Sequence, residues 1–380
     1  MGKAAMSEQL GDRAGRPTAA LIKLYTRWAQ GGAGLLVTGN VIVDRSQPVE
    51  PYNVVIDGDA DVDVLARWAE AARSGGAHVW VELNHPGRQA PWVFNRRPVA
   101  PSPVRLRMGG AFARPRALTG REIADLIDRF GRASAVVESA GFTGVEVHAA
   151  HGYLISQFLS PLTNRRTDEW GGTLEGRMRL LLETVRAVRA RVSAGFAVAV
   201  KLNSADFQRG GFDLSDAVKV VDALNDEGVD LVEVTGGNYE SPTMSGDLTP
   251  TGQEAYFLDY ARQVRQVARM PLMLTGGLRS TEVMAEVVAG GAVDVVGLAR
   301  PMATLPDLPA RLLGGAPIPD LAGPRLSGWR LADLALHNPW HNQQMRRLGQ
   351  GLDPDPDRGL ARTAAYAAAT ALRWRMGLGG

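Results

Sequence analysis

The sequence predicts a single (β/α)8 TIM barrel of the α/β class, with long loops at the carboxyl ends of its strands. Three observations support this fold class. Short apolar runs alternate with amphipathic helical patterns eight times along the chain. No obvious linker interrupts the alternation, and no Gly-x-Gly-x-x-Gly motif follows the early strands, which disfavours an open dinucleotide-binding sheet.

The eight repeats occupy residues 1–315. Strands are expected at residues 3–6, 34–39, 77–83, 144–148, 196–202, 229–235, 271–275 and 293–298. Helices are expected near residues 17–30, 60–74, 121–140, 175–193, 214–227, 256–269, 280–290 and 306–313. Several of these helices have start signals: Pro17 at a first helical position, Thr119 with Glu122 as a capping box, and Asp213 ahead of residues 214–227.

Three long loops follow strands and therefore lie on the carboxyl-end face, where barrel enzymes place their chemistry. Residues 84–118 contain six prolines and cannot be helical throughout. Residues 149–174 carry a histidine motif, and residues 236–255 form the third loop. Residues 316–380 are expected to be a partly helical C-terminal extension, with a helix at 361–376 that packs on the barrel or on a partner subunit.

The composition excludes several classes of protein. The formal net charge is only +2, although the pI is 9.0, so neither a nucleic-acid nor a membrane partner is indicated. The chain has no cysteine, which excludes disulfides, thiolate metal sites, iron–sulfur clusters and a cysteine nucleophile. No apolar run approaches the ~20 residues of a membrane span, and the N-terminus lacks a signal-peptide core. These features favour a cytoplasmic protein.

The run Gly144-Val-Glu-Val-His-Ala-Ala-His-Gly-Tyr153 is the most informative part of the sequence. His148 ends a strand, His151 lies in the turn beyond it, and Tyr153 follows. Two ring N–H groups and one phenol can then converge on one point, where they could hold a polarised oxygen and deliver a proton. On spacing alone, a metal-binding His-x-x-His or ordinary loop histidines are about as well supported.

A second candidate site lies at the ends of the last two strands. Gly276 and Gly277 follow the seventh strand, and Ala299 and Arg300 follow the eighth. Small residues expose backbone N–H groups, and the arginine adds positive charge, so a phosphate site is expected here. For either element alone, tight turns and a surface arginine are an equally good explanation.

Lys201 ends a strand and should point into the barrel mouth, where an unpaired cation would be costly. An anionic ligand would compensate its charge. Glu146, which lies on the same strand face as His148, would do so as well. A purely structural pair of Lys201 with Glu146 therefore remains an alternative.

Together these residues resemble the old yellow enzyme family of FMN-dependent ene-reductases, over about residues 3–313. The resemblance depends on six motifs in the same order: Lys3-Ala-Ala-Met-Ser7, Leu83-Asn-His-Pro-Gly-Arg88, the histidine run, Ser160-Pro-Leu-Thr-Asn-Arg-Arg-Thr-Asp-Glu-Trp-Gly-Gly172, Lys201-Leu-Asn-Ser-Ala-Asp-Phe207 and Gly297-Leu-Ala-Arg-Pro301.

The resemblance implies a role for each of these residues. His148 and His151 would bind the carbonyl or nitro oxygen of the substrate, as in bacterial members with two histidines, and Tyr153 would protonate the neighbouring carbon. Ala5, Met6 and Ser7 would lie along the flavin ring, Asn40 would meet the ring from the second strand, and Lys201 would face flavin N1 and O2. Gly276, Gly277, Ala299 and Arg300 would hold the FMN phosphate.

The implied reaction uses non-covalently bound FMN and NADH or NADPH as the hydride donor. The substrate would be an alkene conjugated to a carbonyl or nitro group. No metal is expected. A homodimer or tetramer is implied by the resemblance only.

Two departures from the family pattern affect the cofactor site. Glu82 stands where the family has a glutamine, so either the tuning of the flavin has changed or Glu82 is protonated. Lys201 or Arg88 could offset a carboxylate at this position. In addition, the first strand begins almost at Met1 and is expected to be truncated, which predicts a less stable chain.

Three rival functions are considered. A flavin dehydrogenase or dienoyl-CoA reductase on the same barrel is disfavoured by the absence of cysteine. A catalytically impaired flavin-binding barrel is disfavoured by the intact histidine run. A metal hydrolase using His148, His151 and His85 is the third; His337 and His341, four residues apart, are interpreted as surface or interface residues.

Overall fold

The computed structural model describes residues 1–58, 60–241, 255, 257–316 and 330–377. Eight parallel strands form a closed ring, because β2 pairs with both β1 and β5. In ring order the strands are β1 (Gly2–Lys3), β2 (Leu35–Val37), β5 (His78–Asn84), β8 (Gly144–Ala149), β9 (Ala197–Asn203), β10 (Leu231–Thr235), β11 (Leu272–Thr275) and β12 (Val295–Leu298). The predicted (β/α)8 barrel is confirmed.

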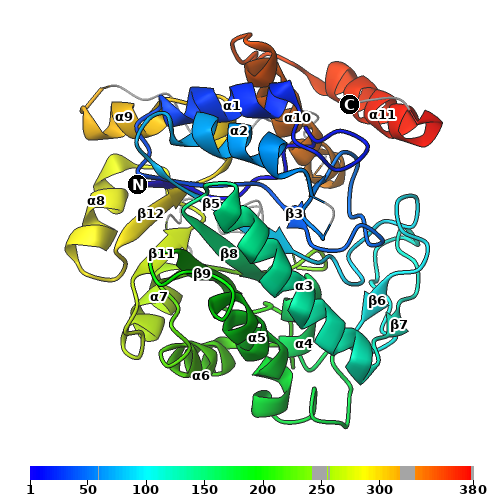
Figure 1. The fold of residues 1–380 in the computed structure, drawn as a ribbon. Helices are drawn as coiled ribbons and strands as arrows, with labels where there is room; N and C mark the ends of the chain where they lie inside the picture. The colour runs from blue at the N-terminus through cyan, green and yellow to red at the C-terminus, as the bar shows by residue number, and fades with distance from the viewer. Residues whose placement is uncertain (59, 242–254, 256, 317–329, 378–380) are drawn as a thin grey trace.

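Helices surround this ring (Figure 1). They are α1 (Ala19–Ala29), α2 (Val62–Arg73), α3 (Gly120–Ser139), α4 (Leu154–Leu159), α5 (Leu174–Arg189), α6 (Leu214–Leu224), α7 (Leu258–Arg265), α8 (Thr281–Ala289), the 3-10 helix η2 (Arg300–Ala303), and α9 (Leu308–Leu313). Short strands β3 (Val41–Ile42) and β4 (Val54–Val55) extend the sheet beside β5, and β6 (Val99–Ala100) pairs with β7 (Arg116–Ala117) inside the long loop after β5.

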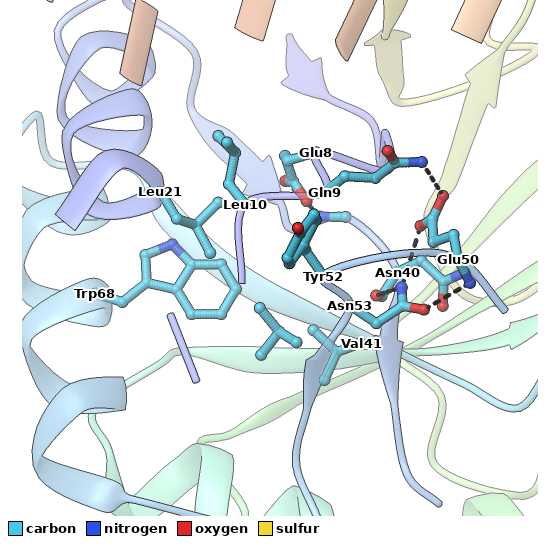
Figure 2. A pocket seen from close by; sticks show the side chains of 12 residues that line it. Glu8, Gln9, Leu10, Leu21, Asn40, Val41, Glu50, Tyr52, Asn53 and Trp68 are labelled. Atoms are coloured by element: carbon cyan, nitrogen blue, oxygen red, sulfur yellow. Dashed lines mark hydrogen bonds between the residues drawn. The ribbon is translucent and has the colours of Figure 1, made fainter. Parts of the chain in front are cut away.

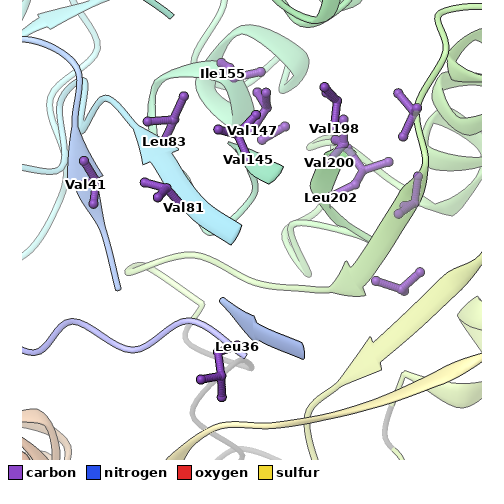
Figure 3. Packing of buried hydrophobic residues seen from close by; sticks show 14 of the residues in the cluster. Leu36, Val41, Val81, Leu83, Val145, Val147, Ile155, Val198, Val200 and Leu202 are labelled. Atoms are coloured by element: carbon purple, nitrogen blue, oxygen red, sulfur yellow. The ribbon is translucent and has the colours of Figure 1, made fainter. Parts of the chain in front are cut away.

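The main core lies between the strands and the helices. Successive strand residues point to opposite faces, so Val145 and Val147 point outward while Glu146 and His148 point inward. Figure 3 shows Val81, Leu83, Val198 and Val200 in the same outer layer, all of them fully buried. Inside the ring, a smaller apolar cluster includes Met273 of β11 together with Trp80 and Ala199, which lie two residues before Glu82 and Lys201 on their own strands. The pleat therefore leaves the carboxyl end of the barrel for polar side chains.

The helix caps follow the sequence signals closely. Thr119 and Glu122 form the predicted capping box of α3, and Asp213 accepts a hydrogen bond from the Asp216 N–H at the start of α6. The prediction for Pro17 was wrong, because Thr18 is the N-cap of α1 and its hydroxyl accepts the Leu21 N–H. Pro17 therefore precedes the helix.

The first strand is shorter and earlier than predicted. It spans Gly2–Lys3, and each of its residues pairs with both β12 and β2. The Ala4 N–H still donates to the Leu298 carbonyl at 2.8 Å, and the chain then leaves the sheet. Residues 5–7 therefore form a loop at the carboxyl end of β1 and do not continue the strand.

Residues 330–377 of the C-terminal region contain two helices, of which the sequence predicted only α11 (Leu360–Met376). The unpredicted helix α10 (Arg330–Gln350) contains Pro339, and it buries the polar side chains Asn342, Gln343 and Gln344 as well as apolar Met345 and Leu348. It packs against α1, where Gly349 has no room for a Cβ because that atom would lie 2.6 Å from the Ala20 carbonyl oxygen. No helix in the described part of the chain is long and apolar enough to cross a bilayer.

Candidate active site

The histidine run turns sharply at the end of β8. His151 and Gly152 both have left-handed backbone, with φ of 58° and 75°. A Cβ on Gly152 would lie 2.6 Å from Gln89 Oε1, so only glycine fits at this position. The turn brings the His148 ring centroid within 5.1 Å of His151 and 4.9 Å of Tyr153. The three predicted side chains therefore meet at one place.

Hydrogen bonds fix both imidazoles. The Ala150 N–H donates to His148 Nδ1 at 3.2 Å, which leaves the proton of a neutral ring on Nε2. His151 Nε2 lies 3.0 Å from the Thr235 hydroxyl, at the end of β10. Burial lowers the pKa of both histidines well below the ordinary value, and the positive charge of Lys201 acts in the same direction. Both rings are therefore neutral at pH 7.

Two neighbouring side chains hold the turn. Gln89 Nε2 donates to the His151 carbonyl at 2.7 Å, and Asn203 Oδ1 accepts the His151 N–H at 3.0 Å. The strained conformation at His151 is thus stabilised by bonds to the loop after β5 and to the end of β9.

Tyr153 is the N-cap residue of α4, and its hydroxyl oxygen lies 3.0 Å from that of Tyr239. Burial raises the pKa of Tyr153 well above the ordinary value, and the nearby phenol of Tyr239 adds to the shift. The phenol is therefore protonated at neutral pH and can act as a proton donor.

A cluster of buried charges, which we call the charged floor, lies next to the histidines. It consists of Lys201 and the three glutamates Glu82, Glu146 and Glu233. Lys201 Nζ donates to Glu82 and to Glu146, the latter at 2.7 Å, and lies 3.4 Å from Glu233 Oε2. On the side facing the histidines, Glu82 Oε2 is 3.8 Å from His148 Nε2.

Three carboxylates around one ammonium leave an excess of negative charge. Burial opposes the charge on Lys201, but the attraction of Glu146, Glu233 and Glu82 prevails and raises its pKa well above the ordinary value. Burial raises the pKa of all three glutamates, that of Glu233 to about 8. The alternative that Glu146 pairs with Lys201 is therefore observed, together with two further carboxylates that spacing did not reveal.

The predicted phosphate corner is assembled by neighbouring strands. β11 pairs with β12 through Thr275 and Gly297, so the residues that follow both strands lie side by side. Gly276 and Gly277 have φ of 125° and 71°, and their N–H groups donate to no other described residue. Ala299 and Arg300 lead from β12 into η2.

The loop after β1 lies against the end of β2. A Cβ on Gly39 would lie 2.1 Å from the Met6 carbonyl oxygen, so the two segments are in close contact. Ala5, Met6 and Ser7 are partly buried, and Asn342 of α10, with its amide nitrogen facing the loop, donates to the Ser7 carbonyl at 3.0 Å. Helix α10 therefore holds residues 5–7, the segment that the family resemblance assigned to the flavin ring.

Asn40 lies between this loop and the end of β5. Its Oδ1 accepts a hydrogen bond from Asn84 Nδ2 at 3.0 Å, while its own Nδ2 is buried without a described partner. Figure 2 shows Asn40 on the wall of a small cavity, with Gln9 and Asn53 bonded to Glu50 on the same side.

The described residues include no group of three or more histidine, aspartate and glutamate side chains placed to hold a metal. His85 Nδ1 accepts the Gly87 N–H at 3.1 Å, and its Nε2 lies 4.0 Å from Asp44. His341 Nδ1 contacts the His337 carbonyl at 2.7 Å, and both rings are buried, which corrects the prediction that they are surface residues.

Four contributors to the site were not found from the sequence: Gln89, Thr235, Glu233 and Tyr239. Period-2 counting along β10 places Glu233 and Thr235 on one face, which could have indicated them. Gln89 and Tyr239 lie on loops, whose approach to β8 no local pattern encodes. Residues 242–254 of the third loop lie outside the described residues.

Comparisons with known proteins identify the family of the chain. The sequence profile of the NADH:flavin oxidoreductase / NADH oxidase family matches residues 2–317. The chain is 36% identical over 370 residues to the NADH-dependent flavin oxidoreductase iliE of Hypocrea jecorina, covering 90% of each protein. It is 40% identical over 333 residues to the NADH-dependent flavin oxidoreductase nadA of Aspergillus parasiticus, covering 82% of this chain and 74% of that one.

A solved structure has the same fold. The old yellow enzyme homologue from Zymomonas mobilis superposes with a TM-score of 0.72 at 26% identity, covering 84% of this chain and 90% of that one. Since the family profile spans most of the chain and encloses the whole barrel, the chain is an oxidoreductase of the NADH:flavin oxidoreductase / NADH oxidase family, the old yellow enzyme family, and its cofactors are FMN and NADH.

Proposed function

We propose that this oxidoreductase reduces the C=C bond of α,β-unsaturated carbonyl or nitro compounds with hydride from NADH. The observation that supports this most is the convergence of two neutral histidines and a protonated tyrosine beside the charged floor. Bound FMN would supply hydride transfer; the residues described below would supply binding, polarisation and protons.

The described residues fit a flavin. Gly276 and Gly277 offer N–H groups without a described partner, as an anionic phosphate requires. Asn40 Nδ2 and Asn84 Oδ1 are buried polar atoms without a described partner, and a ring with donors and acceptors on its edge would satisfy such atoms.

The residues assigned to FMN divide into three groups. The loop residues Ala5, Met6 and Ser7, together with Asn40, would contact the ring. Glu82 and Lys201 would face its pyrimidine edge, where Lys201 supplies positive charge and a protonated Glu82 could donate as well as accept a hydrogen bond. Gly276, Gly277, Ala299 and Arg300 would hold the phosphate.

His148 and His151 would bind the activating oxygen of the substrate. A neutral imidazole with its proton on Nε2 donates one hydrogen bond, and the Ala150 N–H holds His148 in that form. Negative charge develops on the substrate oxygen as hydride reaches the β-carbon. Donors placed in advance at such an oxygen contribute about 3–4 kcal/mol each in other enzymes.

Tyr153 would deliver the proton to the carbon next to the activating group. Its phenol is buried, retains its proton at neutral pH and lies beside His148. The proton donor Tyr153 and the hydrogen-bond donors His148 and His151 thus lie side by side at the carboxyl end of the barrel. A reaction that adds hydride and a proton to neighbouring carbons requires this arrangement.

NADH is favoured over NADPH by the arginines of the long loop. Arg105 donates to the Phe112 and Gly110 carbonyls, Arg114 to the Pro103 carbonyl, and Arg116 pairs with Glu122. These guanidinium groups hold the loop itself, so they are poorly placed to serve a 2′-phosphate.

An absorbance spectrum from 300 to 550 nm tests the proposal. Flavin bands that bleach anaerobically with NADH and return with 2-cyclohexenone would support both half-reactions. Bands that bleach with NADH but return only with oxygen would contradict the alkene substrate and favour an NADH oxidase, the name carried by a relative from Thermoanaerobacter brockii that is 34% identical over 315 residues. Bands that never bleach would indicate a flavin-binding barrel without catalysis.

A further inference from the structure

A second tyrosine contacts the proposed proton donor. Tyr239 follows β10, and its hydroxyl oxygen lies 3.0 Å from that of Tyr153, with the ring centroids 6.0 Å apart and the rings inclined at 70°. Tyr153 packs in a cluster with Ile42 and Val49, and Tyr239 packs against the same cluster. The two hydroxyl groups are within hydrogen-bond distance, and the apolar cluster limits the competition of water for them.

The position of Tyr239 is fixed from the loop after β5. Gln89 Oε1 accepts the Tyr239 N–H at 3.3 Å, while Gln89 Nε2 donates to the His151 carbonyl at 2.7 Å. One buried amide therefore ties the backbone of Tyr239 to the backbone of the histidine turn. The distance between the two phenols depends on the same residue that holds His151.

An ion pair beside Gln89 fixes the next residue. Arg88 Nη2 donates to Glu240 at 2.7 Å, and the two side chains are only 6% and 17% exposed. The Glu240 carboxylate also accepts the Arg107 N–H at 2.9 Å. Residues 239 and 240 are thus held by neighbouring residues of one loop, which fixes the backbone from which the Tyr239 phenol reaches Tyr153.

Proton delivery by Tyr153 creates a charge that needs a donor. When the Tyr153 O–H bond breaks and a C–H bond forms on the substrate, the electron pair stays on the Tyr153 oxygen as a phenolate. A buried phenolate without a hydrogen-bond donor is costly. The Tyr239 hydroxyl lies within reach to donate to that oxygen, and a water proton then restores Tyr153.

We propose that Tyr239 is a positioning residue that acts through Tyr153, donating its hydroxyl to the Tyr153 oxygen and stabilising the phenolate that proton delivery leaves behind. The inference rests on the proposed function and adds to it a residue outside the histidine run.

The first experiment measures the reoxidation of NADH-reduced holoenzyme by 2-cyclohexenone in rapid mixing. Tyr239→Phe should slow this step about 10- to 100-fold, the range of a hydrogen bond to a charged group. Tyr153→Phe should slow it at least as much, and the double variant should be no slower than Tyr153→Phe alone. Reduction by NADH needs no proton from Tyr153 and should therefore slow far less than reoxidation in all three variants, and Tyr366→Phe on α11 serves as the matched control.

Two results of this experiment would overturn the proposal. One is an unchanged rate in Tyr239→Phe. The other is an equal fractional loss from Tyr239→Phe in the wild-type and Tyr153→Phe backgrounds, because a residue that acts through Tyr153 has no effect once that phenol is absent.

A second measurement does not require turnover. A fluorinated tyrosine at position 153 has a more acidic phenol, whose titration can be followed by 19F NMR in holoenzyme. While Tyr153 is protonated, Tyr239 raises its pKa. A Tyr239 hydroxyl that turns to donate to the phenolate has the opposite effect, so the proposal predicts that Tyr239→Phe raises the titration midpoint of residue 153 by about one pH unit or more. An unchanged or lowered midpoint would overturn the proposal, whereas a wild-type enzyme that NADH reduces but cyclohexenone never reoxidises would contradict only the alkene substrate.

Discussion

The histidine turn and the charged floor meet at the buried side chains of His148 and Glu82, yet burial has opposite effects on the charges of the two regions. Burial lowers the pKa of His148 and His151, so both rings are neutral donors. The same effect raises the pKa of the glutamates, but Lys201 retains its charge because three carboxylates surround it. Desolvation removes charge wherever no opposite charge compensates it.

This difference separates two tasks. A neutral imidazole binds a developing oxyanion through a directed N–H group. Because the ring carries no charge, its burial does not incur the desolvation cost of an ion. The floor supplies a fixed positive charge whose neighbours can still exchange a proton. One region therefore governs orientation, and the other governs charge.

The largest expected effect is the loss of stability caused by a substitution in the charged floor. Lys201→Met keeps the length of the side chain but leaves Glu82, Glu146 and Glu233 without a cation. We expect the free energy of unfolding to fall by about 3–5 kcal/mol, the cost of a buried charge that loses its partner. Urea unfolding of the purified protein measures this change.

The charge-conserving variant Lys201→Arg is the control and should lose less stability than Lys201→Met. Adding Glu146→Gln to Lys201→Met should restore part of the loss, because it removes one uncompensated carboxylate. Equal stability of Lys201→Met and wild type would mean that the floor is neutral, and the contrast between the two regions would disappear.

The next effect is on the histidine turn. His148→Ala should lower the turnover of 2-cyclohexenone about 10²- to 10³-fold, because it removes a donor placed at the developing oxyanion. Anaerobic reduction of the flavin by NADH should change far less. His148→Asn keeps a donor and should retain part of the activity, while an equal loss in both half-reactions would argue against a role at the substrate oxygen.

The pH dependence of stability separates the two regions further. The pKa of Glu233 rises from the ordinary 4.5 to about 8, so between these values the folded protein holds a proton that the unfolded chain has lost. Stability from this group is therefore lost as the pH rises, by at most about 1.4 kcal/mol per pH unit. Below pH 4.5 and above pH 8 the group contributes no slope.

Urea unfolding between pH 5 and 8 tests this sign. Glu233→Gln should flatten the decline, since a neutral amide does not titrate. Lys201 does not interfere, because its raised pKa places its own titration above the range studied. An undiminished decline in Glu233→Gln would show that the proton resides on another carboxylate, such as Glu82 or Glu146, whose pKa values burial also raises.

The smallest expected effect is on the partner of His151. Thr235→Val replaces the hydroxyl 3.0 Å from His151 Nε2 with a methyl group of similar size. Losing one neutral hydrogen bond should lower cyclohexenone turnover about fivefold, or about 1 kcal/mol. Thr235→Ser is the matched control, and a loss as large as that of His148→Ala would mean that Thr235 itself contacts the substrate.

The sequence by itself determined the barrel, because strand and helix periodicities are local patterns and eight repeats close only in a few ways. It also determined that His148, His151 and Tyr153 meet, since they lie within six residues around one glycine turn. It failed at the first strand, which ends at Lys3, and at α10, which contains Pro339 and buries polar side chains beside apolar ones.

Only the tertiary structure decided which distant residues complete the site. Glu82, Glu233 and Lys201 come from three strands, and their contacts depend on how the strands stagger around the ring. Gln89 and Tyr239 reach the histidine turn from loops whose course is set by long-range contacts such as the pair of Arg88 with Glu240. Local propensity specifies elements and short turns, whereas charge balance and hydrogen-bond satisfaction are properties of the closed barrel.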